Sequence, residues 1–294
     1  QTKTPLHSYL SLLRDDPILH LVNEAQRRAL AAALADSPHA GLPLLSATAP
    51  FKTGGRGGPA HFTDIPKGPL RLRHIADLYG FPNTLCGLLV TGADVRDWLE
   101  RAAICFNQIM PGLPDQPLLD PSVPGHDFDV IDGLSYAIDL SQPARYDLFG
   151  ALINPKARRI RDLRHAGKPV RHDAHFIIAT NSYRAHGGGP FAPLAETGLI
   201  YSGTRPVRDI LADHVAALGQ IAAAPDPTWR FAPQPGTTVT VETGPGLRAH
   251  PADIAALNAT DLGLTETGFL RLSLPLPDTQ PTLAHPVADA YMTP

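Results

Sequence analysis

Residues 46–59 of the chain read SATAPFKTGGRGGP, and two later stretches have the same character: DFDVIDGLSYAIDLSQPARYD at residues 127–147 and ATNSYRAHGGGPF at residues 179–191. Each stretch places glycines beside an aromatic ring or an arginine. Glycine lets backbone N–H groups approach a phosphate, arginine neutralises the phosphate charge, and aromatic rings stack on a base. Together the three stretches predict a nucleotide site.

These stretches resemble the C-terminal, substrate-binding domain of the 5'-nucleotidase family, in particular its 2',3'-cyclic-nucleotide 2'-phosphodiesterase/3'-nucleotidase branch. The similarity begins near residue 15 with DDPILHLVNEAQ. It continues through APFKTGGRGGPAHFTDIPKGPL and DLYGFPNTLCGLLVTGADVRDWLE and fades after about residue 235. The resemblance implies a substrate-binding domain of that family, preceded by a helix that links two domains and acts as their hinge.

Composition limits the kind of ligand. The 294 residues are 43% hydrophobic, which suffices for a sizeable core, and the formal net charge is -3. That charge provides no basic field for a nucleic-acid polymer, so we expect a small ligand. No apolar run reaches the roughly 18 residues of a membrane span, and no leader opens the chain at Gln1. The resemblance implies a periplasmic enzyme, whose export signal would have been removed or would lie on another part.

The order of the expected elements indicates a mixed fold. A helix is predicted from the cap Asp16 and Pro17 to the break at Ser37-Pro38. CGLLVTG at residues 86–92 is predicted as a strand that leads into an amphipathic helix. From Asp129 on, short alternating segments predict strands, with Gly167-Lys168 as a hairpin turn. The sequence therefore predicts the α+β (mixed α/β) class.

The last third of the chain contains fewer signals. We expect a helix over residues 207–223 and a pair of strands in TTVTVET (237–243) and FLRLSLPL (269–276). The predicted organisation is a linker-helix region at residues 1–38, the binding domain at 39–275 and a flexible tail at 276–294. Cys86 and Cys105 lie in apolar surroundings and would pair only if the fold brought them together.

The glycine loop around Arg56 is the first candidate contact. Arg56 lies between Gly54-Gly55 and Gly57-Gly58. Ordering so many glycines is costly for a purely structural loop, because glycine loses the most conformational entropy on folding. A contact from Arg56 to a phosphate or a base edge explains the loop better. It is not a Walker P-loop, since no Lys-Ser or Lys-Thr follows the glycines.

Aromatic residues are candidates for stacking on the base. By position Phe128 and Phe191 resemble the two rings that clamp the base in this family, although a phenylalanine at the start of a strand is often simply core. The second ring is left open between Tyr183, His186 and Phe191. The glycines of the turn, Gly187 and Gly188, complete this part of the predicted site.

Polar residues complete the predicted site. Asn83 is able to hydrogen-bond a base or ribose, and it is equally suited to a turn. Asp132 is able to accept from the ligand, but Asp132-Gly133 is also an ordinary turn pair, which we favour. Asn181, Tyr183 and Arg184 follow a buried strand, where side chains commonly line a cleft.

No metal site and no nucleophile are predicted in this chain. Its 13 histidines include His172 and His175, which would point to opposite faces of a strand, and there is no H-E-x-x-H or C-x-x-C. Ser46 lacks the G-x-S-x-G context of a nucleophile. The resemblance implies that two divalent metal ions are held by an N-terminal metallophosphatase domain of the same polypeptide, a domain absent from this chain.

The predicted function is to bind the nucleotide for a metal-dependent hydrolase of nucleotide catabolism that acts on 2',3'-cyclic nucleotides and 3'-nucleotides. By itself the chain is expected to be inactive, and neither a nucleic-acid polymer nor a membrane is expected as a partner. Two alternatives remain open. The chain is the binding half of a 5'-nucleotidase or nucleotide-sugar hydrolase, or it is a stand-alone nucleotide-binding module.

Overall fold

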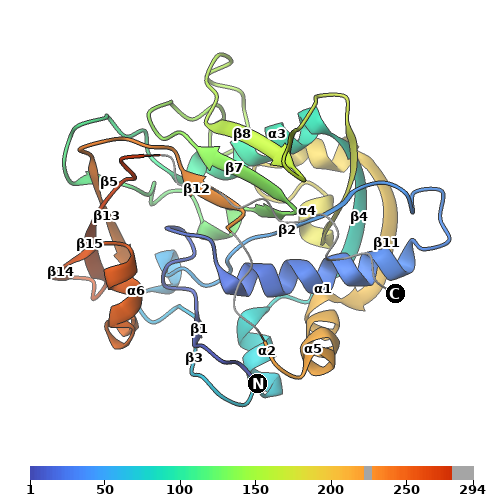
Figure 1. Ribbon diagram of the computed structural model, residues 1–294, viewed down its shortest axis with the longest axis horizontal. Coiled ribbons are helices and arrows are strands. Elements are labelled where there is room, and N and C mark those ends of the chain that lie inside the picture. Colours follow the sequence, from blue (N-terminus) through green and yellow to red (C-terminus); the bar gives the residue numbers. More distant parts are fainter. Residues whose placement is uncertain (222–226, 280–294) are drawn as a thin grey trace.

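A five-stranded mixed sheet organises the chain (Figure 1). The computed structural model describes residues 1–221 and 227–279. The strands, in their order across the sheet, are β11 (Gly198–Pro206), β4 (Thr84–Thr91), β10 (His175–Asn181), β2 (Leu44–Thr48) and β6 (Val130–Asp132). β10 and β2 run parallel, whereas the other neighbouring pairs are antiparallel. This mixture confirms the predicted α+β class.

Both faces of this sheet are covered. Successive side chains of a strand point to opposite faces. Phe176 and Ile178 of β10 therefore pack in one hydrophobic cluster, while Ile177 and Ala179 pack in a second cluster on the other side. β10 thus separates two cores, which explains why its sequence, HFIIATN, is apolar without alternation.

Helices α1 (Pro17–Ala33), α2 (Leu72–Leu78) and α5 (Val207–Leu218) form the second cluster on one side of the sheet (Figure 1). Asp16 caps α1 as predicted, with its side chain accepting from the N–H of Ile18 and Pro17 in the first turn. One face of α1 is buried between Ile18 and Leu30, and the helix contacts β2, β10 and α5, so it is an integral part of the core.

On the other side lie α3 (Gly92–Ala102) and a four-stranded sheet. This sheet contains, in order, β12 (Trp229–Phe231), β7 (Leu134–Ile138), β8 (Ile160–His165) and β9 (Lys168–Pro169). The predicted hairpin forms between β8 and β9, but its turn is one residue earlier than predicted: Ala166 and Gly167 have positive φ, of 47° and 75°, and Lys168 already pairs with His165. The helix predicted after the strand at residues 86–92 is confirmed as α3, which Thr91 caps.

A third sheet packs in the same hydrophobic cluster as the second. Its strands, in order, are β14 (Thr260–Leu264), β15 (Leu270–Pro275), β13 (Thr238–Thr243) and β5 (Gln116–Pro117). The remaining elements are β1 (Leu6–His7), β3 (Asp64–Ile65), α4 (Ser182–Ala185), α6 (Pro251–Ala256) and the 3₁₀ turns η1 (Gly55–Gly57), η2 (Ala103–Cys105), η3 (Gly125–Asp127), η4 (Ala192–Glu196) and η5 (Pro245–Ala249).

Several predicted boundaries differ from the observed ones. α5 ends at Leu218 rather than at residue 223, because Gly219 adopts a positive φ of 63°. β11 was not predicted, since its half-exposed residues give no strong alternation. Leu276, the first residue of the predicted tail, is buried, and residues 280–294 lie outside the described residues. Cys86 and Cys105 are both buried free thiols. Within the described ranges, no helix is long and apolar enough to cross a membrane.

A buried ion cluster attaches α1 to the sheet. His20 Nε2 donates to Asp15 Oδ2 (2.6 Å) and Nδ1 to Asp132 Oδ1 (3.2 Å), and the His20 side chain is only 9% exposed. Burial by itself would lower the pKa of His20. Hydrogen bonds to Asp132 and Asp15 and their negative charges outweigh burial and raise this pKa to about 10. The imidazole is therefore positively charged at neutral pH.

We predict that the stabilising effect of His20 depends on pH. Folding raises the pKa of this group from the ordinary 6.5 to about 10, so its contribution is complete below about pH 6.5 and is lost as pH rises towards about 10. The difference in free energy of unfolding between wild type and His20→Gln, measured by urea titration, should shrink over this range. The exposed His172 provides the control His172→Gln. A His20→Gln difference that stays constant with pH would contradict the prediction.

Candidate functional site

The strand directions bring four loops to one edge of the five-stranded sheet. β2 and β10 are parallel, so the segments that follow Thr48 and Asn181 leave at the same edge. β4 is antiparallel to β10 and β6 is antiparallel to β2, so the segments that precede Thr84 and Val130 arrive there. All three glycine-rich stretches of the sequence therefore meet at this edge, together with the Phe81-Pro82-Asn83 segment.

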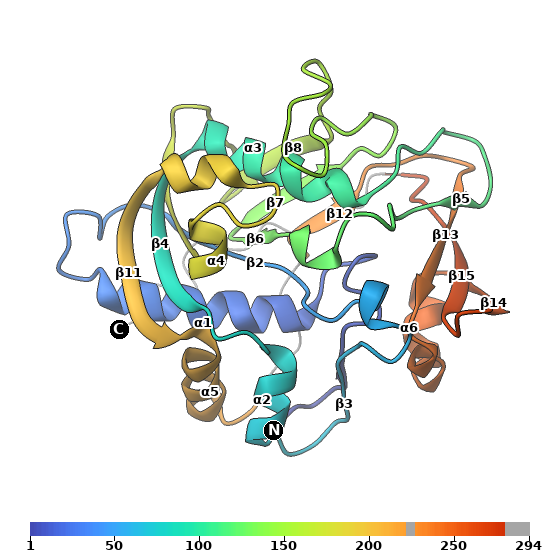
Figure 2. The ribbon, with the colours of Figure 1, turned by 180° about the vertical axis from the view of Figure 1, so that it is seen from behind.

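Direct contacts tie these loops together. The N–H of Thr84 donates to Ser182 Oγ (3.1 Å), which joins the start of β4 to α4, and α4 lies beside β4 (Figure 2). A Cβ on Gly125 would lie 2.2 Å from Thr53 Oγ1, so only glycine lets these two segments pack so closely. The ring of Phe51 lies 5.2 Å from that of Phe81. The edge is thus one connected surface.

Arg184 is the main cross-link beneath this surface. Its side chain is 3% exposed and its guanidinium donates to the carbonyl oxygens of His126 (2.8 Å) and Gly188 (2.5 Å). Nε lies 2.7 Å from Asp129 Oδ2, which also accepts from the indole of Trp98 at 2.7 Å. One buried arginine therefore connects the loop after β10 with the segment before β6. The sequence indicated Arg184 as a cleft residue after a buried strand, but not its role as a buried cross-link.

Asp127 completes this buried charge cluster. Its Oδ1 lies 3.6 Å from Arg184 Nη1. Burial raises the pKa of Asp127, although the positive charge of Arg184 acts in the opposite direction. A Cβ on Gly189, which has a φ of 72°, would lie 2.4 Å from Asp127 Oδ1. The glycine turn is therefore shaped to fit closely over the buried charges.

The glycines after α4 have defined structural roles. Gly187 has a φ of 83°, and its N–H donates to the carbonyl of Arg184 (3.0 Å) while the N–H of Gly188 donates to that of Tyr183 (3.0 Å). This pattern is a Schellman motif that ends the helix. Gly188 lies flat against the Tyr183 ring, because a Cβ there would be 2.5 Å from it. The turn thereby holds the Tyr183 side chain, which is 48% exposed.

The glycine loop after β2 presents Arg56 to solvent. Gly54, with a φ of 77°, is buried against the rings of Phe62 and Phe269, and Gly55 has a φ of 53°. Arg56 is exposed, and its guanidinium has no hydrogen-bond or ion-pair partner in the part of the chain that the structure describes. Lys52, earlier in the same loop, is instead paired with Asp77 of α2. Arg56 is therefore available to a ligand.

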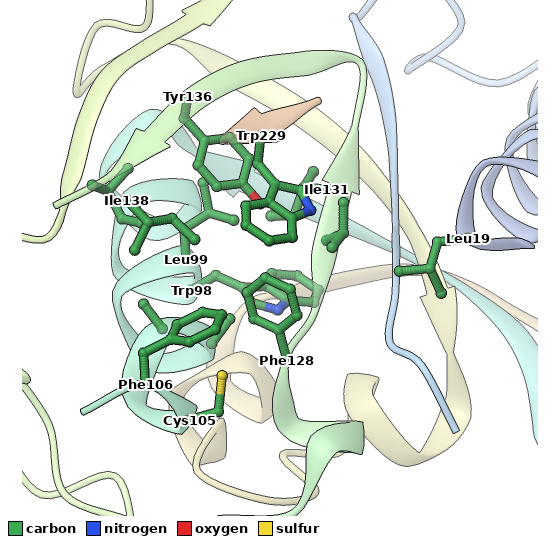
Figure 3. Packing of buried hydrophobic residues seen from close by; sticks show 14 of the residues in the cluster. Leu19, Trp98, Leu99, Cys105, Phe106, Phe128, Ile131, Tyr136, Ile138 and Trp229 are labelled. Carbon is green, nitrogen blue, oxygen red and sulfur yellow. The ribbon is translucent and has the colours of Figure 1, made fainter. Parts of the chain in front are cut away.

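The structure buries Phe128 and Phe191, the two rings proposed by position for the base clamp. Phe128 is 1% exposed and packs edge-on against Phe106 and Trp229, each 5.1 Å away between ring centroids (Figure 3). Phe191 is 0% exposed and lies under the guanidinium of Arg184 at 4.0 Å. Neither ring is able to stack on a base without leaving the core. The core interpretation of Phe128, weighed against the clamp, is the one that the structure supports.

Other rings at the edge are exposed. Phe81 is 46% exposed and follows α2, in the segment that leads into β4. The sequence drew attention to its neighbour Asn83 but not to Phe81 itself. Asn83 is partly buried, and its carbonyl accepts from the N–H of Val207 at the start of α5 (2.8 Å). Its side-chain amide remains a candidate ligand contact beside Phe81.

Three further candidates have different positions. Asp132 lies at the far end of β6, opposite Ser46, and is bound to His20, so the structure separates it from the site edge. Asn181 is buried, and its Oδ1 accepts from the N–H of Arg184 (3.0 Å), so its side chain caps α4. His186 is exposed at the edge, with Nδ1 donating to the carbonyl of Ser182 (2.6 Å).

Comparison with known proteins agrees with this architecture. A 2',3'-cyclic-nucleotide 2'-phosphodiesterase/3'-nucleotidase of Haemophilus influenzae is 41% identical over 278 residues, which are 90% of this chain and 42% of that protein. A protein of the same name from Yersinia enterocolitica is 43% identical over 255 residues, covering 83% and 39%. The structure of a 5'-nucleotidase precursor from Thermus thermophilus matches with a TM-score of 0.57 at 19% identity, covering 80% of this chain and 39% of that one.

The fold and the gathered loops define the class: an α+β domain that presents glycine-rich loops at one edge of a mixed sheet. The family model for the 5'-nucleotidase C-terminal domain matches residues 2–196. The chain therefore belongs to the 5'-nucleotidase C-terminal domain family. It spans 39–42% of the length of the two relatives named above, so it corresponds to a part of such proteins.

We predict that Phe128→Ala destabilises the fold. Removing a fully buried phenylalanine leaves a cavity between Phe106 and Trp229, so the free energy of unfolding should fall by about 3–5 kcal/mol. Tyr183→Ala, which truncates an exposed ring, should change it far less. Urea unfolding of both variants beside wild type measures the effect. Equal stability of wild type and Phe128→Ala would place this ring outside the core.

Proposed function

We propose that the chain is the nucleotide-binding, substrate-specificity domain of a metal-dependent phosphoesterase that hydrolyses 2',3'-cyclic nucleotides and 3'-nucleotides. The observation that carries the proposal is the sheet edge, where the exposed rings of Phe81 and Tyr183 accompany the exposed Arg56 and the glycine loops. The names of the H. influenzae and Y. enterocolitica relatives support the choice of substrate class.

Phe81 and Tyr183 would receive the base. Leu85 and Asn181 face each other in the ladder of β4 and β10, and the two rings lie a few residues beyond that pair, on the segments that leave the same end. Stacking contributes about 1–3 kcal/mol per base and accepts every base. The amide of Asn83 would hydrogen-bond the base or ribose, and Tyr183 is held in place by Gly188.

Arg56 would bind the phosphate. Its guanidinium is unpaired among the described residues and forms forked, charge-assisted hydrogen bonds with an anion more readily than lysine does. The glycines beside it keep bulk away from the approaching ligand. Such a site would bind the nucleotide by stacking on its base and by contacting its phosphate, and it would accept different bases.

The hydrolytic step would take place on a second domain. An N-terminal metallophosphatase domain of the same polypeptide would hold two divalent metal ions that activate water for attack on the phosphorus. The present domain would bind the nucleoside and hold the ester at that centre. We place the complete enzyme in the periplasm and assign it to nucleotide catabolism; the relatives' greater length leaves room for the catalytic domain.

The direct test is binding of 3'-AMP to the purified chain by calorimetry. We expect Phe81→Ala and Tyr183→Ala each to weaken binding by about 1–3 kcal/mol, because each removes an exposed ring from the site, while the thermal midpoint stays close to that of wild type. Phe149→Ala is the matched control, since Phe149 is 80% exposed on the loop between β7 and β8.

The same titration separates related functions. The chain should bind 3'-AMP without hydrolysing it or 2',3'-cyclic AMP, even with manganese added, because the proposal assigns the catalytic metals to the other domain. Tighter binding of 5'-AMP than of 3'-AMP would favour the binding half of a 5'-nucleotidase. Metal-dependent turnover by the pure chain, or unchanged affinity in both ring variants, would refute the proposed division of roles.

We predict that Arg56 discriminates a nucleotide from its nucleoside. A hydrogen bond to a charged group contributes about 1.5–3 kcal/mol. Arg56→Ala should therefore weaken the binding of 3'-AMP by this amount and leave the binding of adenosine unchanged. Arg56→Lys keeps the charge but loses the fork, and should recover only part of the loss. Calorimetry with both ligands measures this. Equal weakening of both ligands would show that Arg56 contacts the base or ribose.

A further inference from the structure

Two histidines and an aspartate that are far apart in the sequence meet beside the third sheet. His7 lies in β1, His250 precedes α6 and Asp253 lies within α6, and one potential ligand atom from each falls within 4.8 Å of the others. The side chains of His7 and His250 are 6% and 11% exposed, and that of Asp253 is 30% exposed. The cluster is thus largely shielded but reachable from solvent.

The hydrogen bonds of the cluster leave His7 incompletely satisfied. His7 Nε2 donates to Asp253 Oδ2 (2.9 Å), while the buried Nδ1 has no hydrogen-bond partner among the described residues. The rings of His7 and His250 lie 4.4 Å apart between centroids. Imidazole nitrogens and carboxylate oxygens are the ligand atoms that Zn²⁺ takes in proteins.

Outer residues orient the three side chains. His250 Nε2 donates to Asp64 Oδ1 (3.1 Å), and Asp64 Oδ2 accepts from the hydroxyl of Tyr9 (3.1 Å). A carboxylate behind a histidine in this way is typical of metal centres, where it fixes the ring and raises its basicity. Arg14 Nη2 donates to Asp253 Oδ1 (2.5 Å), which leaves Oδ2 on the side of His7.

We propose that His7, His250 and Asp253 form a binding site for a zinc-like divalent ion. Two imidazoles and one carboxylate suit Zn²⁺, which takes four ligands, whereas Ca²⁺ and Mg²⁺ prefer oxygen ligands alone. Water would occupy the fourth position. The ion would replace the direct contact of His7 with Asp253 by a bond to each. This site is separate from the ligand edge and from the catalytic metals assigned to the other domain.

Such an ion would have a structural effect. It would fasten β1, near the start of the chain, to α6, which connects β13 and β14 of the third sheet. The rings of Tyr9 and Phe62 lie nearby, tilted with their centroids 5.2 Å apart. Phe62 in turn supports Gly54 of the Arg56 loop. Because the ion binds only the assembled cluster, it should stabilise the folded chain by mass action.

The test uses the complete chain, freed of metal with a chelator and then titrated with zinc by calorimetry. We expect one equivalent to bind and the thermal midpoint to rise with zinc concentration. His250→Gln and Asp253→Asn should each weaken zinc binding at least tenfold, whereas the exposed His172→Gln should bind as wild type does. Two variants are used so that loss of folding in one, judged by its metal-free melting curve, does not decide the outcome.

Cobalt provides a second readout, since Co²⁺ in a tetrahedral site with imidazole ligands gives an intense visible absorption band. Wild type with Co²⁺ should show this band, and the band should disappear when zinc displaces the cobalt. If wild type binds no stoichiometric zinc, or if both cluster variants bind it with wild-type affinity, the cluster is only a hydrogen-bonded network and the proposal is wrong. The 3'-AMP binding titrations are carried out with chelator present, and the turnover assay with manganese is run separately, so the binding result does not depend on this site.

Discussion

β10 is hydrogen-bonded on both sides and buried on both faces, and the position of every candidate ligand contact follows from its direction. Its parallel pairing with β2 sends the Arg56 loop to the same edge as α4, and its antiparallel pairing with β4 brings Phe81 and Asn83 there. A slip of one residue would turn Ile177 and Ile178 towards the wrong cores. The two hydrophobic cores thus fix the register, and the register fixes the site.

Arg184 converts this shared edge into a rigid surface. A buried ion pair adds little net stability compared with apolar packing, but loss of one partner leaves an uncompensated buried charge, which costs about 3–5 kcal/mol. Here the guanidinium also satisfies the carbonyls of His126 and Gly188, and it covers the ring of Phe191. The arginine therefore holds together the two loops on which the exposed Tyr183 depends. Preorganisation of this kind reduces the entropy lost when a ligand binds.

The sequence predicted those parts of the molecule whose signals are local. The cap at Asp16, the strand before Gly92 and the hairpin between β8 and β9 each depend on a few adjacent residues. All three are found, although the hairpin turn lies one residue earlier than predicted. Phe128 and Phe191 also adjoin glycines, yet adjacency says nothing about which way a ring points, and both lie in the core. The direction of β6 removes Asp132 from the ligand edge. The pairing of His7 with Asp253 could not be predicted, because the two residues are far apart along the chain. These features are set by tertiary structure.

The position of α1 limits how the domain would move. The family resemblance implies a hinge at this helix, but α1 buries its apolar face between Ile18 and Leu30, and its His20 is bound to Asp132 of the sheet. Rotation about the helix would expose this apolar face and break a buried charge cluster, both of which are costly. Even β1, before the helix, pairs with β3. The chain from β1 through α1 should therefore move with the nucleotide site as one body, and a joint to a catalytic domain would lie outside it; zinc at His7 would make that body stiffer still.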